Sequence, residues 1–154
     1  RSNMLIILEG CDGAGKTTLA KLLQSTISNS NIIHCNRETP NDLQFFENIV
    51  QESYSRTIIA DRFCYGQFVY QEPEDRPLSY EDGVNMWDNP YAGLHKLETH
   101  MLNADVKLIY VYANLEDIQR RLSARNESVP AHTILKKYEE LWTKTLLQPT
   151  FYRT

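Results

Sequence analysis

The chain has 154 residues, of which 42% are hydrophobic, which suffices for one core and predicts a single domain over residues 4–154. Its formal net charge of −4 and its dispersed Lys and Arg residues argue against nucleic acid or an anionic membrane as a partner. No apolar run is long enough to cross a bilayer and no segment resembles a signal peptide, so we expect a cytoplasmic protein. Residues 1–3 precede Met4 and are interpreted as an expression-tag remnant.

The first half of the chain alternates between strand and helix patterns. A near-continuous apolar run over 4–9 predicts a strand buried on both faces, and apolar residues at helical spacing over 19–27 predict the next helix. A second strand is expected over 32–37, an amphipathic helix over 43–50 and a third buried strand over 57–60.

The second half continues the alternation after an irregular segment. Residues 72–89 are rich in Pro, acidic and aromatic residues without a clear period. Asn89 followed by Pro90 predicts a helix start, and 106–113 is a fourth apolar strand. Asn114 is expected to cap the next helix, and a last helix is expected from Thr133.

This order of elements fixes the expected fold class. Strands separated by helices imply parallel pairing with helices on both sheet faces, which is a three-layer α/β/α sandwich. Four strands are predicted, and 150–153 is left open as a fifth. Three widely spaced cysteines predict reduced thiols and neither a disulfide framework nor a metal site.

The segment 10–17, GCDGAGKT, satisfies the Walker A pattern and has the context that this pattern requires, a buried strand before it and a helix after it. We call it the phosphate loop. Glycines allow backbone N–H groups to point inward, the Lys16 ammonium reaches the outer phosphates, and the Thr17 hydroxyl can bind Mg²⁺. The pattern thus predicts a P-loop NTPase fold that binds ATP and Mg²⁺. The expected nucleotide-binding residues are Asp12, Gly13, Ala14, Gly15, Lys16, Thr17 and Thr18.

The third strand ends in Asp61-Arg62. An acidic residue there can hold Mg²⁺ as a Walker B aspartate does, and the alternative is that Asp61 caps the next helix. Arg62 would present a charged fork at the carboxyl edge of the sheet, where ligands of such folds bind, and its alternative is a salt bridge to Asp61 or Glu38. No Asn-Lys-x-Asp stretch follows a later strand, which disfavours a GTPase and favours a phosphotransferase.

The segments 7–18, Asp61-Arg62 and Tyr70-Gln71 together resemble the thymidylate kinases, a family of P-loop nucleoside monophosphate kinases. The segment 108–125 is similar to that family's strand, helix and start of a mobile lid. The resemblance implies transfer of the γ-phosphate of ATP to a deoxynucleoside monophosphate, with conversion of dTMP to dTDP as the expected reaction. It also implies a homodimer, on which the sequence itself is silent.

The same resemblance assigns acceptor residues. Asp12 matches an aspartate near the acceptor sugar, Arg62 and Arg37 match arginines that grip its phosphate, Gln67 matches a residue facing the base, and Tyr70 matches an aromatic packed against the sugar. The alternatives are an exposed amide for Gln67 and a core aromatic for Tyr70.

The chain also departs from the family pattern. Only residues 39–56 fill the stretch between the second and third strands, which in the family is longer and carries base-binding residues. A replacement by the segment 72–89 is considered, with Tyr80 and Trp87 as stacking candidates, but the preferred interpretation of those two aromatics is as packing residues.

Catalysis of phosphoryl transfer requires cations aimed at the transferred group. Some thymidylate kinases carry an arginine in the phosphate loop where this chain has Gly13. Besides Lys16 and Arg62, we therefore expect Arg121 or, by preference, Arg125 to reach the phosphates from a lid over 121–133. The alternative is a solvated basic helix face.

Two other functions remain compatible with these motifs. A deoxynucleoside kinase would need a carboxylate base such as Glu9 or Asp61 near the acceptor hydroxyl. A catalytically weak nucleotide-binding regulatory protein would retain the loop without turnover.

Overall fold

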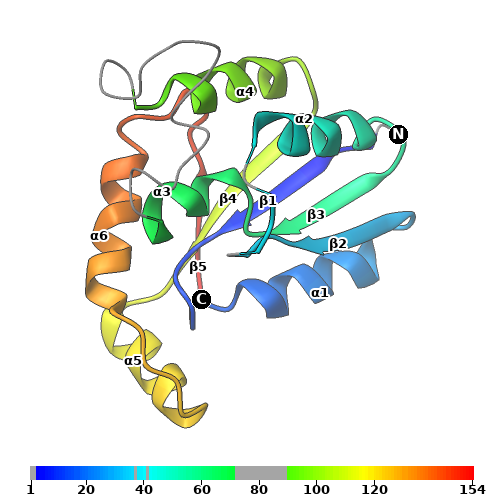
Figure 1. The fold of residues 1–154 in the computed structure, drawn as a ribbon. Coiled ribbons are helices and arrows are strands. Elements are labelled where there is room, and N and C mark those ends of the chain that lie inside the picture. Colours follow the sequence, from blue (N-terminus) through cyan, green and yellow to red (C-terminus); the bar gives the residue numbers. More distant parts are fainter. Residues whose placement is uncertain (1–2, 37, 41, 72–89) are drawn as a thin grey trace.

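The computed structural model describes residues 3–36, 38–40, 42–71 and 90–154 (Figure 1). Several sequence-based expectations lie outside these residues. They are the acceptor residue Arg37, the irregular segment 72–89 with Tyr80, Trp87 and the expected cap Asn89, and residues 1–2 of the expected tag.

A five-stranded parallel sheet forms the middle layer, in the order β2-β3-β1-β4-β5. The strands are β1 (Leu5–Glu9), β2 (Ser30–His34), β3 (Thr57–Asp61), β4 (Val106–Tyr112) and β5 (Thr150–Arg153). The fold-class prediction is confirmed, and the fifth strand that the sequence left open does form. Central β1 is buried along its whole length, as its apolar run predicts.

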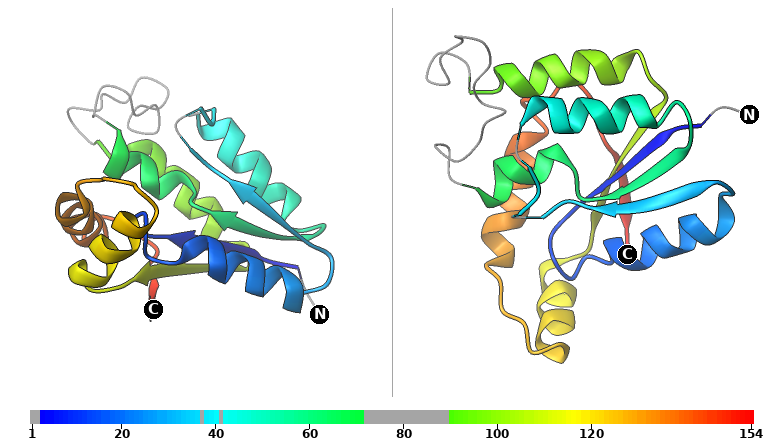
Figure 2. Two further views of the ribbon diagram at one scale, coloured as in Figure 1. Left: turned by 90° about the horizontal axis from the view of Figure 1, so that it is seen from below. Right: turned by 45° about the vertical axis from the view of Figure 1, so that its right-hand side comes forward.

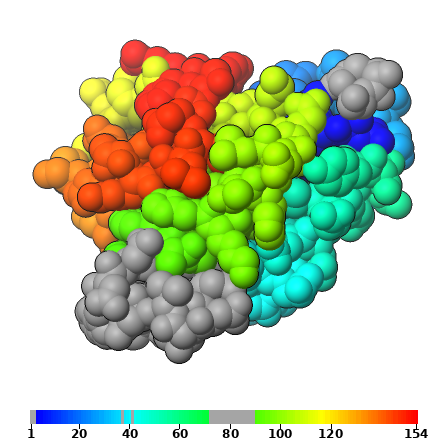
Figure 3. Space-filling model, turned by 90° about the horizontal axis from the view of Figure 1, so that it is seen from above, coloured from blue at the N-terminus to red at the C-terminus, as the bar shows by residue number. Residues whose placement is uncertain are grey.

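Helices cover both faces of this sheet (Figure 2). They are α1 (Lys16–Thr26), α2 (Leu43–Glu52), the 3₁₀ turn η1 (Cys64–Gly66), α3 (Gln67–Tyr70), α4 (Ala92–Leu102), α5 (Leu115–Ala124) and α6 (Ala131–Leu141). α1 lies on one face, whereas α2 and α4 lie on the other. Figure 3 looks onto that second layer, where α4 lies between α2 and the C-terminal part of the chain. None of these helices is long and apolar enough to span a membrane.

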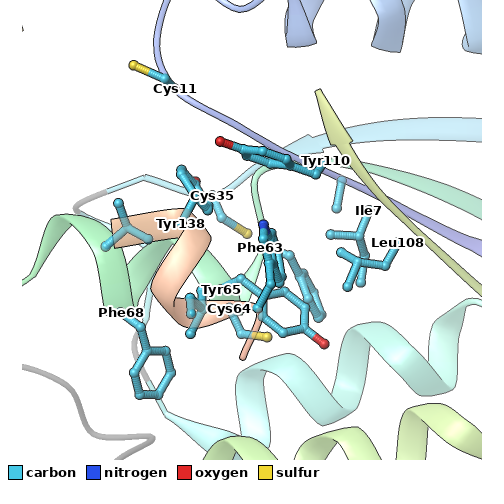
Figure 4. Close-up of a cluster of buried hydrophobic side chains, with 14 of the residues drawn as sticks. Ile7, Cys11, Cys35, Phe63, Cys64, Tyr65, Phe68, Leu108, Tyr110 and Tyr138 are labelled. Atoms are coloured by element: carbon cyan, nitrogen blue, oxygen red, sulfur yellow. The ribbon is translucent and has the colours of Figure 1, made fainter. Parts of the chain in front are cut away.

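The core divides at the sheet because successive strand residues point to opposite faces. Ile6 and Leu8 pack toward α1 in the smaller cluster. Ile7 instead joins the larger cluster, where Tyr110 packs against Tyr138 with ring centroids 5.2 Å apart (Figure 4). All three cysteines, Cys11, Cys35 and Cys64, are free thiols, and all three are buried.

Polar side chains cap the starts of α2 and α5. Asp42 accepts a hydrogen bond from the Phe45 N–H at 2.7 Å at the start of α2, and Asn114 accepts one from the Asp117 N–H at 2.8 Å at the start of α5, as predicted. α6 begins at Ala131, two residues before the expected start, because the Pro130 carbonyl already accepts from the Ile134 N–H.

Two other boundaries differ from the sequence-based expectation. α4 begins at Ala92, two residues after Pro90, and the Tyr91 carbonyl accepts its first helical bond, from His95. β2 ends at His34 because its partner β3 ends at Asp61, which is the residue opposite.

Candidate functional site

The phosphate loop joins β1 to α1 and depends on glycine at two points. A Cβ at Gly10 would lie 2.3 Å from the carbonyl oxygen of Val111 on β4, so no side chain fits between these two backbones. Gly15 has a φ of +100° at the N-cap of α1, a left-handed conformation that other residues rarely adopt. The loop therefore closes into the start of a helix, whose N-terminal N–H groups favour an anion.

A cavity of about 470 Å³, which we call the phosphate cavity, opens beside this loop. Its lining residues are Asp12, Gly13, Gly15, Lys16, Thr17, Thr18, Arg125, Glu127, Ser128 and Val129. Lys16 is only 8% exposed, and burial lowers the pKa of its ammonium. The predicted binding residue Ala14 does not line the cavity, and its N–H donates to the Cys11 carbonyl within the loop at 3.0 Å.

Thr17 and Asp61 lie together at the carboxyl edge of the sheet. The Thr17 hydroxyl donates to Asp61 Oδ2 at 2.8 Å, and Nδ1 of His34 lies 3.1 Å from the same oxygen. Among the described residues no group of three or more His, Cys, Asp or Glu side chains could hold a metal ion alone. A hydroxyl and one carboxylate nevertheless fit Mg²⁺ in a nucleotide site, where substrate phosphates and waters complete the shell.

Glu9, not Asp61, holds the turn that follows β3. Glu9 Oε2 accepts from the N–H groups of Phe63 (2.8 Å) and Gly66 (3.2 Å), and Oε1 accepts from the Tyr138 hydroxyl (2.8 Å). Glu9 is completely buried, and the desolvation of its carboxylate raises its pKa to about 7. From the sequence, Glu9 was expected only as a possible base. The signal for its structural role is an acidic residue that ends an otherwise apolar strand.

Arg62 is held between Asp12 of the phosphate loop and Tyr70 of α3. Its Nη2 donates to Asp12 Oδ1 at 2.9 Å and to the Tyr70 hydroxyl at 3.1 Å, and its guanidinium carbon lies 4.2 Å from the centre of the Tyr70 ring. The ion pair expected as an alternative, to Asp61 or Glu38, is replaced by this pair with Asp12. A Cβ at Gly66 would lie 2.6 Å from Arg62 Cδ, so Gly66 makes room for the side chain.

A second cavity, of about 180 Å³, lies next to Arg62, and we call it the acceptor cavity. Its lining residues are Asp12, Cys35, Asn36, Arg62, Phe63, Gly66, Gln67, Tyr70 and Gln71. Gln67 is 8% exposed, not the exposed amide of the alternative reading. Its buried Oε1 and the buried Nε of Arg62 have no hydrogen-bond partner in the described part of the chain. Two polar atoms of opposite kind are thus left for a ligand.

The two arginines that the sequence assigns to a lid lie at different places. Arg125 follows α5, lines the phosphate cavity and pairs with Glu127 at 3.0 Å. Arg121 does not line that cavity, since its Nη1 donates to the Gly13 carbonyl at 3.1 Å and to Thr154 Oγ1 at 3.0 Å. Both arginines line a third cavity of about 530 Å³ between α1, α5 and β5, which we call the side cavity.

Comparison with known proteins gives structural likeness only. No protein-family model and no protein of curated function matches the sequence. The YorR protein from Bacillus subtilis, solved in complex with phosphorylated GDP, superposes with a TM-score of 0.73 at 24% identity, over 97% of this chain and 85% of that one.

Two nucleotide-metabolism kinases have the same fold. Thymidylate kinase from Candida albicans gives a TM-score of 0.55 at 17% identity, over 99% of this chain and 83% of that one. Deoxyadenosine kinase from M. mycoides gives 0.56 at 19% identity, over 98% and 90%. The chain therefore has the fold of the P-loop kinases.

Proposed function

We propose that this protein is an ATP-dependent, Mg²⁺-requiring kinase of deoxynucleoside monophosphates, with dTMP as its preferred acceptor. The observation that carries the proposal is that Asp12 lines both the phosphate cavity and the acceptor cavity. A donor phosphate held by Lys16 would therefore lie next to an acceptor held by Arg62. The resemblance in sequence to thymidylate kinases supports this reaction, and the structural likeness to two kinases supports phosphoryl transfer in general.

The donor side fits a nucleoside triphosphate. The phosphate cavity and the side cavity share Gly13, Gly15, Thr18 and Arg125, so a triphosphate on the loop leads directly to a space for its nucleoside. Thr17 and Asp61 would hold Mg²⁺, which neutralises developing phosphate charge when it is bound. The buried Lys16 ammonium supplies positive charge in a site where water screens it weakly.

The acceptor side favours a phosphorylated acceptor over a free nucleoside. The unpaired Nε of Arg62 is a donor suited to a phosphate oxygen. The two carboxylates considered above as a base for a hydroxyl are engaged elsewhere, Glu9 with a backbone turn and Asp61 with Thr17 and His34. A third carboxylate, that of Asp12, lines the acceptor cavity and is paired with Arg62. A monophosphate needs no such base, because its oxygen is already a nucleophile. That oxygen forms a bond to the γ-phosphorus of ATP as the bond to the bridging oxygen of ADP breaks.

Gln67 supports a pyrimidine base. Its unpaired Oε1 can accept from the N3–H of thymine, and its amide N–H₂ can donate to a neighbouring carbonyl of that base. Tyr70 lines the same cavity and is hydrogen-bonded to Arg62, and we assign it to contact with the acceptor's sugar.

The test is ADP release with MgATP across dTMP, dUMP, dCMP, dGMP and the four corresponding nucleosides. We expect turnover with monophosphates and the highest kcat/KM with dTMP. Turnover only with nucleosides would favour a deoxynucleoside kinase, and ATP binding without turnover would favour a regulatory protein. Lys16→Met is the control for contaminating kinases, because activity that survives this change undiminished cannot come from the loop.

A further inference from the structure

The outer side of the phosphate loop is held by two residues from distant parts of the chain, Arg121 on α5 and Thr154 after β5. The figures place the C-terminal end beside the start of α1 (Figures 1 and 2). Thr154 Oγ1 donates to the Ala14 carbonyl at 2.8 Å, and Arg121 Nη1 donates both to the Gly13 carbonyl at 3.1 Å and to Thr154 Oγ1 at 3.0 Å. The Thr154 hydroxyl has a single proton and two carbonyls within reach, that of Ala14 at 2.8 Å and that of Tyr112 at 3.3 Å. We assign the proton to the shorter contact, with the loop, while the oxygen accepts from Arg121.

The rest of Thr154 is fixed as well. Its N–H donates to the Tyr112 carbonyl at 2.8 Å, which continues the β4–β5 pairing by one residue. Its Cγ2 lies 3.3 Å from the position that a Cβ on Gly15 would take, so a side chain at residue 15 would be crowded by Thr154. The hydroxyl is therefore presented to the loop by the sheet.

The geometry of the peptide bond explains how these contacts orient the loop. In a planar trans peptide the C=O and the following N–H point in opposite directions. A bond that holds the Ala14 carbonyl outward, toward Thr154, therefore turns the Gly15 N–H inward, toward the phosphate cavity that Gly15 lines. Gly15 has no Cβ and would otherwise allow this peptide to rotate.

We propose that Arg121 and Thr154 are positioning residues, which hold the 14–15 peptide in the orientation that binds the donor's phosphates. The inference rests on the proposed function in that it takes the loop to bind a triphosphate. It gives Arg121 a role in loop geometry, and it leaves Arg125 as the lid arginine that lines the phosphate cavity.

The test compares Thr154→Val, which removes the hydroxyl and retains the shape, with Thr154→Ser, which retains the hydroxyl. Because the hydroxyl's bond to the Ala14 carbonyl is lost together with the one that it accepts from Arg121, we expect the dissociation constant of MgATP to rise about 3- to 10-fold in Thr154→Val. It should stay within about 2-fold of the parent's value in Thr154→Ser. The KM for the acceptor and the thermal midpoint should not change. Calorimetry, steady-state kinetics and thermal unfolding give these three quantities.

Arg121→Gln should weaken MgATP binding by about 5- to 30-fold, since a charged donor is lost. Arg120→Gln is the matched control, because Arg120 is the neighbouring residue on α5 and pairs with Asp117 instead of the loop. The double variant Arg121→Gln with Thr154→Val should lose less than the product of the two single losses, because both residues hold the same loop. A double variant whose loss equals the full product of the two single losses would overturn the inference. A loss in Arg120→Gln equal to that in Arg121→Gln would overturn it as well.

Arg121 and Thr154 also line the side cavity, so a direct contact with the donor's base must be separated from an effect on the loop. Tripolyphosphate has no base, and we expect its affinity to fall by the same factors as that of MgATP. A loss confined to ATP would overturn the inference.

A ligand-free measurement separates this inference from the proposed function. The amide resonances of residues 13–16 should shift in Thr154→Val and Arg121→Gln and stay in place in Arg120→Gln. Unchanged resonances would overturn the positioning role even if ATP binds. A parent chain that binds no ATP would instead overturn the proposed function.

Discussion

The carboxylate of Glu9 is buried one residue before the phosphate loop and is hydrogen-bonded to the turn that carries Arg62 into the acceptor cavity. One residue therefore connects the donor side of the site, through β1, with the acceptor side, through the turn after β3. Its third partner, the Tyr138 hydroxyl, comes from α6, so three elements meet at this buried charge.

Glu9 predicts a specific dependence of stability on pH. Burial raises its pKa from 4.5 to about 7, so between these values the folded state binds more protons than the unfolded state. The contribution of this shift to the free energy of unfolding is complete below pH 4.5. As the pH rises from 4.5 through 7, this contribution of about 3 kcal/mol is lost. In Glu9→Gln this loss should disappear, so urea unfolding of the variant should depend less on pH from 4.5 to 8. Glu52→Gln, on an exposed face of α2, should keep the parent's profile, and a parallel profile for Glu9→Gln would contradict the prediction.

Replacing Lys16 should lower activity without lowering stability. Its ammonium is 8% exposed, and its lowered pKa reflects the cost of burial, which Lys16→Met removes. We expect turnover to fall by roughly 10²- to 10³-fold, as for the loss of other preorganised donors, while the free energy of unfolding stays equal or rises. Lys21→Met, an exposed change on the same helix, should affect neither quantity. Steady-state kinetics, calorimetric ATP titration and urea unfolding are the measurements, and a destabilised Lys16→Met that still binds ATP would refute the assignment.

At the scale of elements, the segment between α5 and α6 contributes Arg125 to the phosphate cavity. Arg125 and Glu127 are each 53% exposed, so their ion pair contributes less than about 1 kcal/mol to folding. An arginine that stabilises transferred phosphate contributes roughly 10³- to 10⁵-fold in rate in GTPases, which sets the upper limit for its loss here. Arg125→Ala should therefore lower kcat strongly with little change in thermal midpoint.

Arg120→Ala is the control for that experiment, since it removes the same charge from α5 without touching the cavity. Steady-state rates at saturating substrates and thermal unfolding test both variants together. If the Arg125→Ala protein were as fast as the parent, Arg125 would not stabilise the transferred phosphate.

The elements themselves were largely predictable, because burial imposes a period on the sequence. β1, β3 and β4 are apolar runs, and the caps Asp42 and Asn114 are local signals that need no tertiary context. β5 has four exposed residues and pairs only with β4, so its sequence carries no such burial signal.

The candidate site was predictable only in part. The glycines, Lys16 and Thr17 follow from a contiguous pattern, whereas the roles of Glu9 and Thr154 depend on which distant backbone groups the fold brings to them. Glu98 is a similar case, because its buried carboxylate accepts from the Tyr65 hydroxyl and from the N–H groups of Leu146 and Leu147, which lie almost 50 residues away. Nothing in the pattern around α4 indicates these partners.

For the whole molecule, ligand binding should appear as added stability. A ligand that binds only the folded state at 100 times its dissociation constant adds about 2.7 kcal/mol. For a domain of this length that corresponds to a rise in thermal midpoint of roughly 5–10 °C with MgATP. The rise should be absent in Lys16→Met, and a parent chain whose midpoint does not move with MgATP would count against nucleotide binding.

The burial of all three cysteines has a practical consequence for anyone handling the protein. Desolvation raises the pKa of Cys11 to about 11 and that of Cys35 to about 12, so at neutral pH the reactive thiolate is scarce even where a reagent can enter. Iodoacetamide should modify the native chain far more slowly than the chain in urea. Because Cys11 belongs to the phosphate loop and Cys64 to the turn that Glu9 anchors, mass-spectrometric labelling rates at the two positions would time the opening of each half of the site separately, with no introduced probe.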